Sequence, residues 1–384
     1  MINIFAPINN LGYGIVANNI IKSLMESQEE ICLSIIGQVQ SDPSFEHYWK
    51  KAQNNFEKFD IKNPSLFLFH DQFSYQACGA PLFVLSMFEG TKIKKDSINI
   101  LMNGPAEIIL TTTEAHKNIL QENGITKTIE VVHCGADDSI FNTLPVNKLI
   151  DTKKFTFITA GKREERKNTD TIIKSFLEVG EDKEVALICH TFNPFLNNTK
   201  DHPFKNLSCW TGINPIGRKF EYQGYKNTYH HFSKDKCDLY FTTPTVPTAN
   251  MSSLYHSANV GIQASRAEGW DLPLAEMMSC GIKNIATNCL GHSEFINDAP
   301  GMKDLIIDNQ ETEIADDGKW FKGDQGEWQK LDSDKLKEKL SWVLENKSEF
   351  GNKDEELSDY MMNNFSWANS VSKIKELCGK YSKE

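Results

Sequence analysis

Short apolar runs alternate with amphipathic segments of helical length along most of the 384-residue chain, and this alternation restricts the fold more than any other feature. Apolar runs followed by segments with a period near 3.6 are typical of β–α units, which build parallel sheets covered by helices. A first set of such units ends near residue 141. It comprises a helix over 15–26 and strands in INIFAP from residue 2, ICLSIIG from 31, SLFLFH from 65, EIILTT from 107 and IEVVHCG from 129.

A second set follows a polar connection at residues 142–154, and the chain is longer than one hydrophobic core usually serves. We predict two Rossmann-like, doubly wound α/β domains, at residues 1–145 and 150–365. A closing helix over about 366–384 belongs with the first domain. The second domain is predicted to contain FTFITAG from 155, a helix over 169–179, VALICH from 185, VGIQAS from 260, a helix from about 272 and KNIATN from 283.

Two stretches do not fit this alternation. Residues 191–236 are rich in aromatic and polar side chains and are expected to form an irregular insertion, whose role the sequence leaves open. Residues 316–328 contain three glycines and are expected to form a loop. A helix is predicted after it, with Asp332 or Ser333 as its N-cap.

Composition narrows the class of protein. With a net charge of −11, the chain lacks the excess of basic residues that is typical of a non-specific nucleic-acid binder. The nine cysteines form no CxxC pair, and their odd number favours a reducing compartment. The N-terminus has no basic segment followed by an apolar one, and no apolar run is long enough to span a bilayer. We therefore expect a cytoplasmic protein without a transmembrane segment.

The stretch SRAEGWDLPLAEMMSCG, residues 265–281, carries the most specific pattern. Asp271 and Pro273 suit the start of a short helix, and Gly281 suits its end. Glu276 then lies on this helix, while Glu268 lies in the loop before it. A helix N-terminus offers free N–H groups and partial positive charge to a phosphate. Carboxylates on either side of such a turn could hold hydroxyl groups at the two ends of a diphosphate.

The longer segment SRAEGWDLPLAEMMSCGIKNIATNCLGHSEFIND resembles the donor-site signature of family-4 glycosyltransferases, which have the GT-B fold. The resemblance implies that Glu268 contacts the donor sugar and Glu276 the ribose. It also places Gly269, Trp270, Asp271 and Leu272 beside the donor. Trp270 and Asp271 stand where the family has Phe and Gly, and that substitution leaves the details of sugar contact open.

A group of four cations follows the first strand of the second domain in AGKREERKNTDTIIKSF. This segment resembles the strand, basic loop and helix that hold the donor diphosphate in the same family. The resemblance implies that Lys162 and Lys167 bind the diphosphate, with Arg163 and Arg166 as alternatives. A solvated loop remains the other interpretation.

In the first half, Gly12, Gly14 and Ala17 form a GxGxxA pattern after a strand. A dinucleotide site also needs an acidic residue after the second strand, and none is present, so an oxidoreductase is disfavoured. The resemblance instead places Gly12 and Gly14 beside the donor phosphate and sugar. It gives His70, expected at the end of a strand, a position near the reacting carbon.

Other polar residues are assigned to structure. His133 and His116 are expected to pack, and no metal-binding spacing stands out, so we expect no metal and no cofactor besides the donor. The segment from Lys92 to Lys95 could touch an anionic lipid or nucleic acid, but a solvated turn is the commoner outcome.

The resemblance implies a retaining, metal-independent glycosyltransferase that uses a nucleoside-diphosphate sugar, with UDP or GDP as candidate nucleotides. Two alternatives remain open: a nucleotide-sugar epimerase of the same fold, and a non-catalytic nucleotide-sugar-binding subunit. The sequence does not identify the donor base or sugar, the linkage, the oligomeric state or the acceptor. A saccharide, a lipid-linked glycan and a modified DNA base are among the candidate acceptors, and contact with a membrane or nucleic acid is unsupported.

Overall fold

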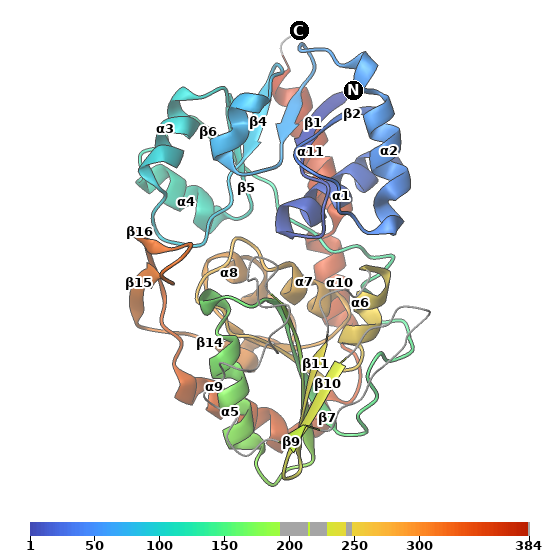
Figure 1. The fold of residues 1–384 in the computed structure, drawn as a ribbon, viewed down its shortest axis with the longest axis vertical. Helices are drawn as coiled ribbons and strands as arrows, with labels where there is room; N and C mark the ends of the chain where they lie inside the picture. Colours follow the sequence, from blue (N-terminus) through green and yellow to red (C-terminus); the bar gives the residue numbers. More distant parts are fainter. Residues whose placement is uncertain (193–213, 216–228, 243–247, 383–384) are drawn as a thin grey trace.

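The computed structural model describes residues 1–192, 214–215, 229–242 and 248–382, which form two α/β domains (Figure 1). The first domain, in the upper half of Figure 1, is built on a six-stranded parallel sheet in the order β2-β1-β3-β4-β5-β6. Its strands are β1 (Ile2–Ala6), β2 (Ile31–Ile35), β3 (Ser65–Phe67), β4 (Leu82–Leu85), β5 (Ile108–Thr111) and β6 (Thr128–Val131).

Helices cover this first sheet because each carries an apolar stripe. In the first of them, Val16, Ile20 and Leu24 are buried at helical spacing. The helices of this domain are α1 (Gly12–Glu26), α2 (Glu46–Asn54), α3 (Lys95–Asn103) and α4 (Glu114–Glu122), with 3₁₀ turns at Pro43–Phe45, Phe56–Lys58 and Asp71–Gln76.

The second domain contains an eight-stranded sheet in the order β14-β13-β12-β7-β8-β11-β10-β9. All its pairings are parallel except those of β10, which runs antiparallel to both neighbours at the far edge. Its strands are β7 (Phe155–Lys162), β8 (Val185–Phe192), β9 (Asn214–Pro215), β10 (Tyr229–Lys234), β11 (Cys237–Thr242), β12 (Val260–Gln263), β13 (Asn284–Thr287) and β14 (Ile306–Ile307).

Three helices of the second half begin at side-chain caps. Side-chain oxygens of Asp332, Asp354 and Ser366 accept backbone N–H bonds at the starts of α9, α10 and α11. The cap at Asp332 confirms the sequence prediction. The helices are α5 (Thr169–Gly180), α6 (Thr248–Tyr255), α7 (Leu272–Ser279), α8 (Leu290–Ile296), α9 (Ser333–Glu345), α10 (Glu355–Asn364) and α11 (Trp367–Tyr381), with 3₁₀ turns at Glu165–Lys167, Lys303–Leu305 and Lys347–Phe350.

Helix α11 returns to the first domain after the whole second domain has been traced. It lies against α1 in the upper half of Figure 1, away from strand β9 at the lower end of the second domain. Its buried side chains, among them Val371, Ile374 and Leu377, join the hydrophobic core that contains Ile20 and Leu24. In the described part of the chain, no helix combines the length and apolar character needed to cross a membrane.

Three local predictions were wrong. Residues 316–328, expected as a loop, belong to an antiparallel hairpin of β15 (Thr312–Asp316) and β16 (Lys322–Gln329). Strand β3 ends at Phe67 rather than at His70, which lies beyond it and precedes a 3₁₀ turn. Part of the 191–236 insertion is regular, because β10 extends the sheet. Residues 193–213 and 216–228 of that insertion lie outside the described residues.

The hairpin of β15 and β16, which we call the strap hairpin, joins the two domains. The amides of Thr91 and Lys92 in the first domain donate to the carbonyls of Glu327 and Gln325, at 3.2 and 3.0 Å. Figure 1 shows this hairpin beside the second domain with its β16 end below α4. On another part of the interface, Asp42 of the first domain accepts the Thr248 amide at the start of α6, at 2.7 Å.

Candidate functional site

The topology brings two chain segments together at the carboxyl edge of the second sheet. Strand order reverses between β7 and β12, which are neighbours although distant in sequence. In open α/β sheets the ligand crevice lies outside the strand ends at such a point. The segments that leave these two strands are 163–168 and 264–271, and both carry the residues singled out from the sequence.

Glu268 lies between two cations from the other segment. Its Oε2 is 2.7 Å from Arg166 Nη1, and its Oε1 is 2.6 Å from Lys167 Nζ. All three side chains are below a tenth exposed. Arg166 also donates to the Ala267 carbonyl at 2.5 Å and contacts Glu164 at 3.2 Å. The two motifs predicted to bind one donor therefore form a single buried ion-pair cluster.

The protonation of this cluster follows from its pairing. Burial alone would raise the pKa of Glu268, but Arg166 and Lys167 outweigh it and hold that pKa well below its usual range. Burial likewise disfavours the Lys167 ammonium, and Asp271 and Glu268 reverse the effect, so its pKa is raised. Breaking one member of such a cluster would leave an uncompensated buried charge.

Asp271 extends the cluster instead of capping α7. It occupies the N-cap position with φ of +81°, and its side chain makes no hydrogen bond to the helix. Its Oδ1 is 3.2 Å from Lys167 Nζ, and its Oδ2 is 2.9 Å from Nε2 of His292. Asp271 thus holds the predicted N-cap position, but its side chain makes no hydrogen bond to the amides of the first helical turn.

Three donor groups in this cluster are close enough to suggest a metal site. Ligand atoms of Glu268, Asp271 and His292 all lie within 4.8 Å of one another. However, the Lys167 ammonium contacts both carboxylates, and both His292 ring nitrogens already face oxygen acceptors. The Lys167 ammonium thus already provides the positive charge that a metal ion would bring. These three residues could bind a metal ion only if Lys167 moved away from the two carboxylates, so they do not fit one as they stand.

Glu276, one turn into α7, has a different environment. Tyr255 of α6 donates its hydroxyl to Glu276 Oε2 at 2.6 Å. Burial raises the pKa of Glu276 to about 8, with the Tyr255 bond opposing the shift and Asp271 and Asp137 adding to it. At neutral pH this carboxyl group is largely protonated, whereas Glu268 is ionised.

The first domain contributes a glycine loop and aromatic rings. A Cβ at Gly14 would lie 2.3 Å from the Asn9 carbonyl oxygen, so this glycine allows a tight turn. Gly12 begins α1, is exposed and has open space where a Cβ would be. The ring of Tyr13 packs against that of His70, with centroids 4.6 Å apart.

Several contacts show that these two sides face each other. Arg166 lies 3.7 Å from Glu89 of the first domain, and Thr112 donates to the Gly269 carbonyl at 2.5 Å. Partial burial lowers the pKa of His70, and the positive charge of Lys162 across the interface lowers it further. The interface therefore brings His70 toward the basic segment of the second domain.

Not every predicted side chain points to this cluster. The indole of Trp270 is buried among aromatic rings, 4.9 Å from Phe295, 5.6 Å from Phe365 and 5.6 Å from His133. Leu272 is partly buried and packs against the core. Neither side chain takes part in the ion pairs described above. Both predicted structural histidines pack: His116 bonds the Phe88 carbonyl, and His133 bonds Glu294.

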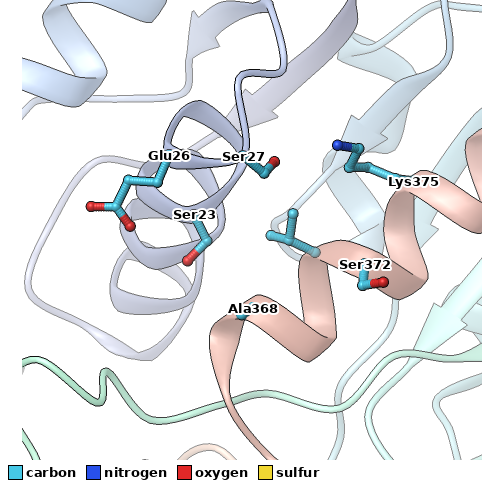
Figure 2. A pocket seen from close by; sticks show the side chains of 7 residues that line it. Ser23, Glu26, Ser27, Ala368, Ser372 and Lys375 are labelled. Carbon is cyan, nitrogen blue, oxygen red and sulfur yellow. The ribbon is translucent and has the colours of Figure 1, made fainter.

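A groove of about 430 Å³ lies elsewhere, between α1 and α11 in the first domain. Figure 2 shows Ser23, Glu26 and Lys375 around it, with Ser372 on the α11 side. It contains none of the predicted donor-binding residues, and its side chains form no catalytic constellation.

Sequence reasoning missed five residues of the site: Tyr13, Glu89, Glu164, Tyr255 and His292. Glu164 pairs with Lys162 at 2.6 Å, which makes the basic segment less free than its composition suggested. Glu164 and His292 lie inside the quoted motifs and could have been found by asking which groups neutralise which. Tyr13 lies inside the GxGxxA pattern, but that pattern gives no role to the residue between the glycines. Glu89 and Tyr255 lie on separate elements, and the sequence carries no signal that unites them.

Comparisons with known proteins agree with this geometry. Residues 219–318 match the family model described as glycosyl transferases group 1. No curated protein matches the chain. A solved sucrose-phosphate synthase from Thermosynechococcus elongatus is 11% identical with a TM-score of 0.67, covering 99% of this chain and 98% of that chain.

Two further solved structures contain UDP and a sugar. HepE from Anabaena, in complex with UDP and glucose, is 11% identical with a TM-score of 0.62 and 99% coverage of both chains. The pneumococcal O-GlcNAc transferase GtfA, in complex with UDP and GlcNAc, is 14% identical with a TM-score of 0.51, covering 88% of this chain and 60% of that chain. The chain therefore has the predicted GT-B fold, with two Rossmann-like domains facing each other.

Proposed function

We propose that this protein transfers a sugar from a nucleoside-diphosphate sugar to a hydroxyl acceptor. The observation that carries the proposal is the buried cluster of Arg166, Lys167 and Glu268 at the strand-order reversal of the second sheet. It faces His70 and Glu89 of the first domain. The match to a glycosyltransferase family model over 219–318 supports the same activity.

The diphosphate is assigned to Lys162 and to the first turn of α7 near Leu272. Lys162 is the most open cation of the basic segment, with 36% of its side chain exposed. The turn at α7 offers backbone N–H groups and the positive end of the helix dipole. Arg166 and Lys167 are buried beside these groups, where they add positive charge and hold Glu268 in place through ion pairs. Together these groups would stabilise the charge that develops on the leaving diphosphate.

The two glutamates would hold hydroxyl groups at the ends of the donor. Glu268, kept ionised by its two cations, would accept from hydroxyls of the transferred sugar. Glu276 has one oxygen bonded to Tyr255, and the other is assigned to the ribose. Because its pKa is about 8, this carboxyl group could donate to a ribose oxygen as well as accept from a hydroxyl.

The reaction itself is proposed to retain anomeric configuration and to need no metal ion. The bond from the anomeric carbon to the diphosphate oxygen breaks, and a bond to the acceptor oxygen forms on the same face. The acceptor proton passes to the departing phosphate oxygen. His70 would position the sugar, and Gly12 would allow the backbone to approach the donor closely. The first domain would hold the acceptor, and the free thiols of the described cysteines suit the expected cytoplasmic location.

The proposal can be tested by ligand-induced stabilisation, because a ligand that binds only the native state raises apparent stability by about 2.7 kcal/mol at a hundredfold excess over Kd. UDP, GDP and ADP and their sugar conjugates would be compared by thermal shift. We expect one nucleotide series to stabilise the protein. Lys162→Ala and Glu276→Gln should weaken that effect at least tenfold in Kd, while Lys174→Ala, exposed on α5, should not.

The outcome separates the alternatives. Transfer to an acceptor, followed by nuclear magnetic resonance of the new anomeric carbon, would establish the glycosyltransferase and its stereochemistry. Turnover of the nucleotide sugar without an acceptor would favour an epimerase. Binding without turnover on any acceptor would favour a non-catalytic subunit, and no stabilisation by any nucleotide sugar would contradict the proposed site.

A further inference from the structure

The buried cluster continues beyond the residues that the donor-site pattern explains. Along it, charges alternate: His292, Asp271, Lys167, Glu268 and Arg166 follow one another with separations of 2.9, 3.2, 2.6 and 2.7 Å. Each of these side chains is below a tenth exposed, and those of His292 and Asp271 are fully buried. His292 ends the series on α8.

The hydrogen bonds of His292 fix its charge. Its Nδ1 lies 2.9 Å from the Thr287 backbone carbonyl, which can only accept. Its Nε2 lies 2.9 Å from Asp271 Oδ2, and the Lys167 ammonium lies 3.2 Å from the other oxygen of the same carboxyl group. Both ring nitrogens thus face oxygen atoms, an arrangement that the doubly protonated imidazolium form satisfies. Burial opposes this form, but the Cys289 sulfur and Asp271 raise the pKa of His292 well above its ordinary value.

The position of Asp271 makes this charge significant. The left-handed φ of +81° at Asp271 is one that glycine adopts readily, and a glycine there would carry no charge. Asp271 therefore adds one negative charge beside Lys167 and beside the helix turn assigned to the diphosphate. Left uncompensated, that charge would hold Lys167 more tightly and repel an anionic donor.

We propose that His292 is a positioning residue that neutralises Asp271 and thereby keeps the cluster attractive to a diphosphate. This inference rests on the proposed function. With His292 charged, three cations and two carboxylates give the series a net charge of +1. Lys162 and Glu164 cancel each other nearby. Glu89 stands 3.7 Å from Arg166 and is a third exposed, so water screens it more than the buried members.

The test is a charge-balanced pair of variants. His292→Gln keeps an N–H for Asp271 but removes the positive charge, which brings the net charge of the series to zero. We expect its Kd for UDP to rise about tenfold, while wild-type and variant protein should bind uridine, which has no phosphate, equally. Asp271→Asn combined with His292→Gln restores the net charge of +1, and its Kd for UDP should return to within about threefold of wild type.

A merely structural role of Asp271 and His292 predicts a different order of UDP affinities for the single and double variants. If the two residues only fill space, the double variant should bind UDP no better than His292→Gln, and that result would overturn the proposal. An unchanged Kd in His292→Gln would overturn it as well. The melting temperatures of the two single variants and the double variant serve as a ligand-free readout, in which the double variant should be more stable than either single one.

Histidine ¹⁵N chemical shifts of the ligand-free protein separate this inference from the proposed function. They should show both nitrogens of His292 protonated at pH 7.5, and a neutral ring would overturn the proposal. If wild-type protein binds none of UDP, GDP or ADP, the donor assignment and the positioning role both fail, whereas the shifts still report whether the ion pair exists.

Discussion

The two sides of the domain interface are built by different means. The second domain presents charges that are buried and paired with one another, as in the contacts of Lys167 with Glu268 and Asp271. The first domain presents a glycine turn and two rings in contact, of which that of Tyr13 is half-buried and His70 is an exposed residue. On the second-domain side, the ion pairs that contribute to folding are the same ones to which donor binding is assigned in the proposed function. On the first-domain side, a side chain can change without leaving a buried charge behind.

The largest expected effect on stability comes from removing Lys167 on the second-domain side. Lys167→Ala leaves Glu268 and Asp271 without their shared ammonium, and loss of one partner from a buried pair typically costs about 3–5 kcal/mol. Urea unfolding should show this loss, while Lys174→Ala should stay within about 0.5 kcal/mol of wild type. A loss below about 1 kcal/mol for Lys167→Ala would mean that water compensates the carboxylates and that the two sides are alike.

The matching change on the first-domain side is His70→Asn. Because His70 lies at an exposed position beyond β3, unfolding free energy should change by less than about 0.5 kcal/mol. Loss of a group that positions the sugar should lower kcat roughly 100-fold, by analogy with removal of one transition-state contact. Steady-state kinetics and UDP titration would check this, with UDP affinity expected to stay within about threefold. An unchanged kcat would remove His70 from the reaction.

The comparison is sharpened inside the second domain by its two glutamates, whose pKa values move in opposite directions. Glu276 has a folded pKa of about 8, above its unfolded value, so the folded protein keeps a proton that the unfolded chain releases. Stability contributed by this group is therefore complete below about pH 4.5 and is lost as pH rises to about 8, by at most about 1.4 kcal/mol per pH unit.

Glu276→Gln should abolish that loss, because glutamine cannot ionise and can still accept the Tyr255 hydroxyl. Denaturant unfolding at several pH values between 5 and 8 would measure it. Glu268 behaves in the opposite sense: its pKa is lowered, so its stabilisation is present at neutral pH and is lost as pH falls below the unfolded value. Parallel pH profiles of wild type and Glu276→Gln would show that Glu276 is ionised in the folded state.

The smallest expected effect concerns the strap hairpin, where the two domains meet through backbone. Gly326 and Gly318 both have positive φ, near +79° and +71°, so alanine strains either position, by about 1 kcal/mol. Only at Gly326 does a new Cβ meet the first domain, 2.4 Å from Thr91 Oγ1. Hydrogen exchange should show that the amides of Thr91 and Lys92 lose protection in Gly326→Ala but not in Gly318→Ala. Equal protection in both would show that the contact adapts.

The two sides also differ in how far they could be predicted. The second-domain side comes from two contiguous motifs, 161–168 and 264–276, and their resemblance to one glycosyltransferase family placed both at the same predicted donor site. The structure shows that Glu268 lies beside Arg166 and Lys167. The charge pairing inside it was not visible, because side-chain pairs such as Asp271 with His292 depend on the turn geometry.

Predictions for the first domain were limited to its general form. Alternating patterns gave the parallel sheet, but β4 (Leu82–Leu85) was not predicted, and the end of β3 was misplaced by three residues, so His70 was assigned to a strand. Residues such as Glu89 and Thr112 reach the interface only through tertiary packing. The hairpin at 312–329 was taken for a loop because its glycines suggested turns, although Phe321 and Trp328 pack there over Ala267.

The return of α11 affects how the chain can mature on the ribosome. Its Val371 and Ile374 complete a core that otherwise belongs to strands and helices synthesised first. During synthesis, part of the apolar surface of the first domain therefore stays uncovered until the second domain and α11 have left the ribosome. A nascent chain that stops before α11 would present that surface to chaperones and proteases.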